Sequence, residues 1–208
     1  MIGNLFIVSA PSGAGKTTLC KMAVDFFPGL RHSVSYTTRA ARPGETNGKD
    51  YWFVDDAAFD RMLSDGEFLE CADVFGKRYG TSKKDLDTLL KAGSDVLLEI
   101  DVQGALNLRK TLNLRKTLNK GAYIFILPPS IKVCEDRLKS RSSEEPEEIQ
   151  RRLKIAVEEI KRAVDYDYVI VNNDLEAAFE RLKAVMIAEK ARTVNMSGAV
   201  EGLLADVR

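Results

Sequence analysis

Eight consecutive residues near the amino terminus have the types and spacing that bind nucleotide phosphates. They are Ala10, Pro11, Ser12, Gly13, Ala14, Gly15, Lys16 and Thr17. Such binding needs inward-pointing backbone N–H groups, glycines that let the chain approach the phosphates, a lysine for the transferred phosphoryl group and a hydroxyl beside a metal ion. We therefore expect a phosphate loop here, with Lys16 as a catalytic residue, Thr17 as a metal ligand and Thr18 as a further phosphate contact.

The loop departs from the usual pattern at its first position, where Ala10 stands instead of glycine. Alanine is acceptable there if the backbone angle φ is negative, because only a positive φ demands glycine. The context supports the motif, since the loop follows the apolar residues 5–8 and precedes a segment whose apolar positions recur at helical spacing. A strand, a loop and a helix in this order favour nucleotide binding over a glycine-rich turn.

A second segment has the composition of a metal or acceptor site. Residues 96–101 form an apolar run that ends in the carboxylates Glu99 and Asp101, like the strand that holds magnesium in phosphate-loop enzymes. We expect Mg²⁺ as cofactor, contacted by Thr17 and, through water, by Asp101. His32 is the only histidine, so Ser-His-Asp and histidine-base mechanisms are excluded, and we expect His32 to be structural or at the surface.

The composition fits one compact domain with a small insertion. The chain has 208 residues, 45% of them hydrophobic, and 31 Lys and Arg balance 31 Asp and Glu. This balance argues against a nucleic-acid-binding polycation, and the apolar content excludes general disorder. Three widely spaced cysteines, Cys20, Cys71 and Cys134, predict free thiols, and the amino terminus lacks the pattern of a signal peptide or membrane span. We expect a cytoplasmic protein with no nucleic-acid or membrane partner.

Four apolar runs predict a parallel sheet. Residues 5–8, 96–98, 123–127 and 168–171 are continuous apolar segments that alternate with helix-compatible sequence. Strands that are apolar throughout are typical of sheets buried on both faces. We therefore predict an α/β fold in which helices wrap a parallel sheet.

Two stretches interrupt this alternation. Residues 33–92 contain short polar and aromatic segments separated by glycine-containing turns, which predicts an inserted subdomain of short strands. Residues 137–152 place basic side chains around the acidic run 144–148, in which Pro146 suits the first turn of a helix. We interpret the second stretch as a mobile lid on a helical base; a solvated pair of charged helices is the alternative.

Several motifs together resemble those of guanylate kinases. They are SYTTRAARPGE at 35–45, NGKDYWF at 47–53, EFLE at 67–70, YGT at 79–81, LEIDVQG at 98–104, ILPPS at 126–130 and VIVNND at 169–174. The resemblance covers about residues 4–190 and implies a P-loop kinase core with two insertions. The implied parts are a core in 1–32, 93–136 and 153–190, a small mixed α/β GMP-binding subdomain in 33–92, a helical lid in 137–152 and a tail in 191–208 without family motifs.

The resemblance also implies which side chains bind GMP. In the family, two arginines and two phenols surround the phosphate with charge-assisted hydrogen bonds. Glu70 can accept from N1–H and the 2-amino group of guanine, whereas adenine would leave this carboxylate badly paired, and Ser35 and Thr81 can donate to O6. The full implied set is Ser35, Arg39, Arg42, Tyr51, Glu70, Tyr79, Thr81, Glu99 and Asp101.

Arg137, Arg141 and Arg152 match the arginines of the family's lid, which approach the transferred phosphoryl group on closure. Asn172 matches a position near the adenine of ATP. The implied reaction moves the γ-phosphoryl group of Mg-ATP to GMP, and also to dGMP, and gives ADP and GDP for guanine nucleotide synthesis and salvage. Catalysis would rest on positioning and charge neutralisation.

Two other functions stay open on the same scaffold. A guanylate-kinase-like protein-interaction module would keep the fold but bind an acidic or phosphorylated partner, although it would not need the intact phosphate loop. A kinase for another small phosphate ester is opposed by Glu70 together with Ser35. We expect ATP and GMP as the small-molecule partners, and a homo-oligomer is left open.

The resemblance does not explain a tandem duplication. Residues 108–113, LRKTLN, are repeated at once in 114–119. Six residues add about 600° of rotation and about 9 Å of rise to a helix, so the leucines of the second copy cannot share a face with Leu108 and Leu112. We expect a helix extension or loop remote from the phosphates, with one leucine pair exposed or covered by another chain and no catalytic role.

Overall fold

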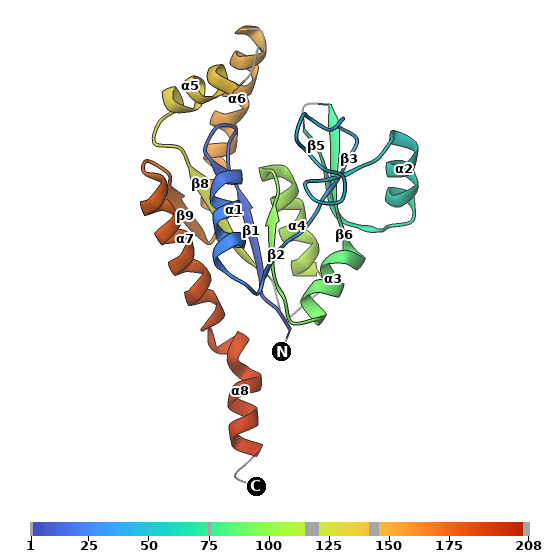
Figure 1. The fold of residues 1–208 in the computed structure, drawn as a ribbon, viewed down its shortest axis with the longest axis vertical. Coiled ribbons are helices and arrows are strands. Elements are labelled where there is room, and N and C mark those ends of the chain that lie inside the picture. The colour runs from blue at the N-terminus through green and yellow to red at the C-terminus, as the bar shows by residue number, and fades with distance from the viewer. Residues whose placement is uncertain (1, 75, 115–120, 142–145, 206–208) are drawn as a thin grey trace.

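A five-stranded parallel sheet, in the order β2-β7-β1-β8-β9, forms the centre of the molecule (Figure 1). The structure is a computed structural model that describes residues 2–74, 76–114, 121–141 and 146–205, with only the backbone at 113, 114, 140, 141 and 146. The strands are β1 (Leu5–Ser9), β2 (Leu30–His32), β7 (Asp95–Glu99), β8 (Ala122–Leu127) and β9 (Tyr168–Val171). The four apolar runs are therefore strands, and the predicted α/β fold is confirmed.

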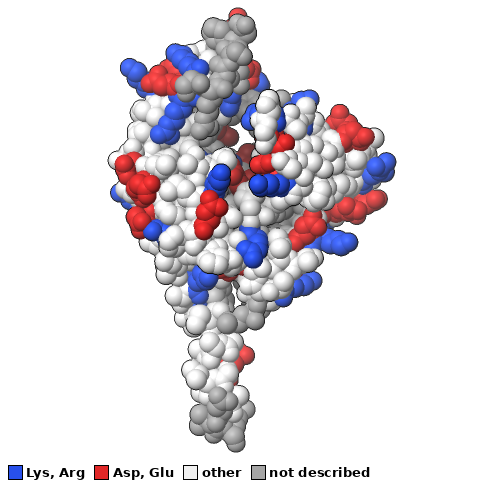
Figure 2. Space-filling model, in the orientation of Figure 1, with Lys and Arg blue, Asp and Glu red and all other residues white. Residues whose placement is uncertain are grey.

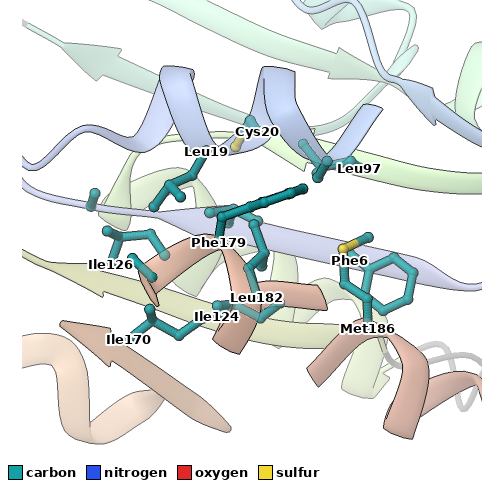
Figure 3. Close-up of a cluster of buried hydrophobic side chains, with 14 of the residues drawn as sticks. Phe6, Leu19, Cys20, Leu97, Ile124, Ile126, Ile170, Phe179, Leu182 and Met186 are labelled. Carbon is teal, nitrogen blue, oxygen red and sulfur yellow. The ribbon is translucent and has the colours of Figure 1, made fainter. Parts of the chain in front are cut away.

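Helices cover both faces of this sheet. On one face lie α1 (Lys16–Phe26) and α7 (Leu175–Lys190), and on the other α3 (Lys83–Lys91) and α4 (Val102–Leu114). Successive side chains of a strand point to opposite faces. Phe6 of β1 accordingly packs with α1 and α7 (Figure 3), whereas Ile7 packs with α3 and α4. Burial on both faces explains why the central strand is apolar throughout.

A smaller sheet, in the order β4-β3-β6-β5, stands beside the core (Figure 1). Its elements are β3 (Tyr36–Thr37), β4 (Trp52–Phe53), α2 (Asp56–Ser64), β5 (Phe68–Val74) and β6 (Lys77–Ser82). Strand β5 packs on α4, because Leu69 joins the hydrophobic cluster of that helix and Asn107 donates from Nδ2 to the carbonyl of Cys71 at 3.3 Å. These contacts set the position of the smaller sheet against the core.

Two helices, α5 (Ile131–Arg141) and α6 (Pro146–Lys161), stand above the carboxyl ends of the strands (Figure 1). They share a small apolar cluster of Cys134, Leu138, Ile149 and Leu153. Helix α6 begins at Pro146, as the acidic run predicts, and the short 3₁₀ helix η1 (Arg162–Asp165) follows it.

The last helix, α8 (Thr193–Ala205), extends away from the body and buries none of its residues (Figure 1). Within the described ranges, no helix combines the length and apolar character that crossing a membrane requires.

The first copy of the duplicated segment lies in α4. Leu108 and Leu112 are buried against the sheet, and Arg109 forms an ion pair with Asp167 at 2.8 Å. Of the second copy, residues 115–119 and the side chain of Leu114 lie outside the described residues. Helix α4 begins next to Asp101 and runs away from the carboxyl ends of the strands. The expected position of the second copy stays a prediction.

Candidate active site

The phosphate loop connects β1 to α1. Gly13 and Gly15 have φ of 84° and 93°, in the left-handed region that glycine adopts without steric cost. A side chain on Gly13 would also press on the backbone of Cys134, whose carbonyl oxygen would lie 3.2 Å from the added Cβ. The methyl group of Ala10 packs into the hydrophobic core, so alanine at this position has a packing role.

Two side chains hold the phosphate loop from outside. Asn172 is buried and donates from Nδ2 to the carbonyl of Ala14 at 2.8 Å. Arg137 donates to the carbonyl of Gly13 at 3.1 Å. Asn172 therefore supports the shape of the loop, and its predicted proximity to adenine stays a prediction.

Strands β1 and β7 bring the two predicted nucleotide motifs together, because Val8 pairs with Glu99 in the parallel register. Lys16 donates from Nζ to the carbonyl of Ile100 at 2.9 Å, and Thr17 donates from Oγ1 to Oε1 of Glu99 at 2.5 Å. His32 lies on the other side of Glu99, with Nε2 at 3.7 Å from Oε2.

These contacts determine the charge of Glu99. Burial alone would raise its pKa, but the neighbouring His32, Lys16 and Thr17 outweigh burial and hold the pKa below its ordinary value. The carboxylate is therefore ionised near neutral pH. His32, expected to be structural or at the surface, contacts a site carboxylate; its short β2 strand brings it there by pairing with β7.

The residues near Thr17 fit a magnesium ion that is shared with a nucleotide. Mg²⁺ prefers oxygen ligands and usually keeps several waters while it binds substrate phosphates. Thr17 and the carboxylates of Glu99 and Asp101 provide such oxygens. In the part of the chain that the structure describes, no group of three or more His, Cys, Asp or Glu could hold a metal ion without further ligands.

One pocket contains residues from the phosphate loop, the end of β7 and the smaller sheet. The molecule is visibly hollowed between the smaller sheet and the helices α5 and α6 (Figure 2). Seven of the predicted site residues line this pocket, together with Val74 and Ile100. The seven are Lys16, Ser35, Tyr51, Glu70, Tyr79, Glu99 and Asp101.

Glu70 is the deepest carboxylate of the smaller sheet. It is 7% exposed, and its Oε1 accepts from the hydroxyl of Thr81 at 2.7 Å across the β5–β6 pair. Burial, together with the nearby Asp101, raises the pKa of Glu70 to about 7. A hydroxyl has one hydrogen, so Thr81 positions Glu70 here, and its predicted donation to O6 of guanine stays a prediction.

A cationic and aromatic cluster forms another part of the site. The guanidinium of Arg39 lies over the ring of Tyr51, 5.2 Å from its centroid, and the rings of Tyr51 and Tyr79 meet edge to face at 5.9 Å. Burial raises the pKa of Tyr51 to about 12, so its phenol stays protonated and able to donate. Arg42 is exposed and does not line the pocket.

Glu45 holds Arg39 in place, a role that its position in the sequence does not reveal. Both oxygens of Glu45 accept from Arg39 at 2.9 Å, and Oε2 also accepts from the backbone N–H of Arg42 at 2.7 Å. This bidentate pair lowers the pKa of Glu45 and fixes the plane of the guanidinium. The signal was present in the RAARPGE motif, but only the fold shows that the carboxylate turns back onto Arg39.

Helices α5 and α6 also contact the phosphate loop. Arg152 donates to Oγ of Ser12 at 2.5 Å, while the side chain of Arg141 lies outside the described residues. Glu159 of α6 was not anticipated: burial and the nearby Asp101 raise its pKa to about 7, although the backbone N–H of Ser12 donates to it.

The fold and site define a class of enzyme. A parallel sheet with a phosphate loop after its first strand, an acceptor pocket formed with a small inserted sheet, and helices that carry arginines to the loop define a P-loop kinase. The pocket is lined by the carboxylate of Glu70 and by the phenols of Tyr51 and Tyr79, and Arg39 packs on Tyr51 beside it. Such a combination suits a ligand that carries both hydrogen-bond donors and a phosphate.

Comparisons with known proteins identify the family. The guanylate kinase family model matches residues 2–189. The chain is 50% identical over 203 residues to the guanylate kinase of Geobacter sulfurreducens, which covers 98% of this chain and 97% of that protein. It is also 50% identical over 191 residues to the guanylate kinase of Geobacter metallireducens, covering 92% and 91%. The crystal structure of guanylate kinase from Anaplasma phagocytophilum is similar, with a TM-score of 0.73, 37% identity and coverage of 93% and 89%.

The chain therefore belongs to the guanylate kinase family, as the motifs indicate. It is an ATP:GMP phosphotransferase.

Proposed function

We propose that the enzyme transfers the γ-phosphoryl group of Mg-ATP to GMP, and also to dGMP, at the pocket beside the phosphate loop. Backbone N–H groups of the loop hold the ATP phosphates, and Lys16 with the lid arginines Arg137, Arg141 and Arg152 stabilises the migrating charge. Mg²⁺, held by Thr17 and through water by Asp101, supplies neutralisation of phosphate charge. No covalent enzyme intermediate is needed, since positioning and electrostatics suffice for this reaction.

The acceptor GMP is bound at its phosphate and at its base. Arg39, with Arg42, Tyr51 and Tyr79, binds the phosphate. Glu45 and the carbonyl of Ala40 accept from three of the five N–H groups of Arg39, and Nε and the second N–H of Nη2 are the groups proposed to donate to the ligand. Glu70 reads N1–H and the 2-amino group of guanine. These contacts reach the base and the phosphate and require no 2′-hydroxyl, which supports the use of dGMP as well as GMP.

The observation that carries this proposal is that one pocket is lined by both Lys16 of the phosphate loop and Glu70 of the smaller sheet. The rival interaction module would need an acceptor pocket but no catalytic lysine within it. The three cysteines are free thiols, which supports a reducing compartment such as the cytoplasm. There the product GDP would serve guanine nucleotide synthesis and salvage.

A coupled assay of ADP release tests the proposal directly. ATP is offered with GMP, dGMP, AMP, CMP or UMP, each with Mg²⁺ and with excess chelator. We expect GMP and dGMP to be accepted, the other three to be poor, and activity to vanish on chelation and return with Mg²⁺. Equal use of AMP, or turnover unaffected by chelation, would contradict the proposal.

The pH dependence of kcat/KM for GMP is expected to report the protonation of the Glu70 carboxyl. Below its pKa of about 7, the carboxyl is protonated and loses an acceptor for guanine, so kcat/KM should rise as pH increases through 7 and then level off. The phosphate of GMP also titrates, near pH 6. Dividing kcat/KM of the wild type by kcat/KM of Glu70→Gln at each pH removes the contribution of the GMP phosphate. If this ratio stays constant between about pH 5 and pH 8, the assignment to Glu70 is refuted.

Deleting residues 114–119 should change the KM values for GMP and ATP by no more than about twofold. The deletion removes the second copy of the duplication and keeps Leu108 and Leu112, which pack against the sheet. Steady-state kinetics on the folded deletion variant check this expectation. A large loss of activity would show that the duplication takes part in function.

A further inference from the structure

Gly104 occupies a position where the backbone does not require glycine. It is the third residue of α4, is buried and has a helical backbone without a positive φ. Glycine is a poor helix former, and alanine would fit the same backbone better. The reason for glycine here must therefore lie in what surrounds its Cα.

Two carboxylates of the proposed site flank Gly104. Its backbone N–H donates to Oδ1 of Asp101 at 2.9 Å, as in a helix N-cap. A Cβ built on Gly104 would lie 2.7 Å from Oε2 and 3.4 Å from Cδ of Glu70, and 3.5 Å from Oδ2 of Asp101. The first distance is much shorter than a van der Waals contact, so Glu70 can keep its place only because Gly104 has no side chain.

The strand that carries Glu70 is held in place on both sides of this residue, so its carboxylate is the part that can move. The other oxygen of Glu70, Oε1, is held by Thr81 at 2.7 Å, and the side chain is 7% exposed. The residues on either side of it in β5 are fastened to α4, Leu69 by burial in the cluster that contains Leu108 and Cys71 by the hydrogen bond from Asn107. A methyl group at position 104 would therefore displace the carboxylate rather than the strand.

We propose that Gly104 is a positioning residue that determines specificity. The absence of a side chain at this position leaves room for the carboxylate of Glu70 beside Asp101, and this placement of Glu70 lets the pocket distinguish guanine from adenine. The inference rests on the proposed function, in which Glu70 reads guanine. Gly104 then acts through Glu70 and need not contact the substrate itself. Displacement of the carboxylate would leave N1–H and the 2-amino group of guanine without their shared acceptor.

Gly104→Ala tests the proposal, because it should separate fold from recognition. We expect the variant to stay folded with a small change in melting temperature, because the helix preference of alanine offsets part of the cost of displacing the buried carboxylate. The KM for GMP should rise by about tenfold or more, and the preference for GMP over AMP in kcat/KM should fall by about ten- to a hundredfold. The KM for ATP should change by less than about twofold.

Gly202→Ala is the matched control. Gly202 is also in a helix, α8, and an added Cβ would meet no atom within 4 Å. This variant should leave both KM values and the base preference unchanged. If Gly104→Ala instead melts at a lower temperature and loses ATP affinity together with GMP affinity, its role is packing and the proposal is overturned.

A double-variant cycle with Glu70→Gln separates failure of this inference from failure of the proposed function. Because Gly104 acts through Glu70, adding Gly104→Ala to Glu70→Gln should cost little further selectivity. If Glu70→Gln reduces selectivity but Gly104→Ala alone does not, the inference about Gly104 is wrong. If Glu70→Gln itself leaves selectivity intact, the guanine reader proposed above is wrong.

Discussion

Replacing Lys16 with methionine is expected to lower kcat by at least about two to three orders of magnitude, while GMP still binds. Lys16 lines the pocket, and its Nζ lies 2.9 Å from the carbonyl of Ile100. A point charge at the transferred group acts mostly on the transition state, so its loss reduces turnover more than substrate binding. Methionine keeps the length and apolar stem of the side chain without the charge.

Lys21→Met is the control for this prediction. Lys21 lies on the same helix, α1, but is exposed, so its replacement should leave kcat unchanged. Calorimetric titration of GMP into Lys16→Met checks that the acceptor site survives. Turnover near the wild-type rate in a folded Lys16→Met variant would contradict the proposed mechanism.

Replacing Glu70 with glutamine is expected to reduce the preference for GMP over AMP by about two to four orders of magnitude. The carboxylate offers acceptors to both N1–H and the 2-amino group of guanine, whereas a glutamine amide must present a donor to one of them. The same donor suits N1 of adenine, which is an acceptor. The substitution therefore weakens the recognition of GMP and improves that of AMP.

The preference is measured as the ratio of kcat/KM for GMP and AMP. Glu67→Gln provides the matched control, because Glu67 immediately precedes the same strand but is exposed. It should leave the ratio unchanged. An unaltered ratio in Glu70→Gln would move guanine recognition to other residues.

The sequence predicts a core element well where the residues of that element alone indicate its structure. The apolar runs that become β1, β7 and β8 are buried on both faces, and such strands need no partner to be recognised. The run that becomes β9 is equally apolar, although Val169 and Val171 are exposed on this edge strand. The phosphate loop can also be recognised from one short segment, since its glycines, lysine and hydroxyl all lie between Gly13 and Thr17. Strand β2 was not predicted, because only Leu30 of its three residues is buried and pairing with β7 decides its structure.

Contacts between distant segments could not be predicted. The sequence does not show that His32 meets Glu99, that Asn172 supports the phosphate loop or that Gly104 faces Glu70. Each of these depends on which strands become neighbours and on how the smaller sheet packs on α4. Family motifs indicate the residues proposed to contact substrate, whereas the residues that position them emerge only from packing in three dimensions.

The most direct test is a competition in one tube between GMP and AMP for ATP that carries a radioactive γ-phosphoryl group. Chromatography then separates labelled GDP from labelled ADP, so the ratio of the two reports transfer and base choice together. The structure predicts that the label appears almost entirely in GDP, and that Glu70→Gln shifts it toward ADP. Release of the label as inorganic phosphate, or comparable labelling of GDP and ADP by the wild-type enzyme, would contradict the central claim.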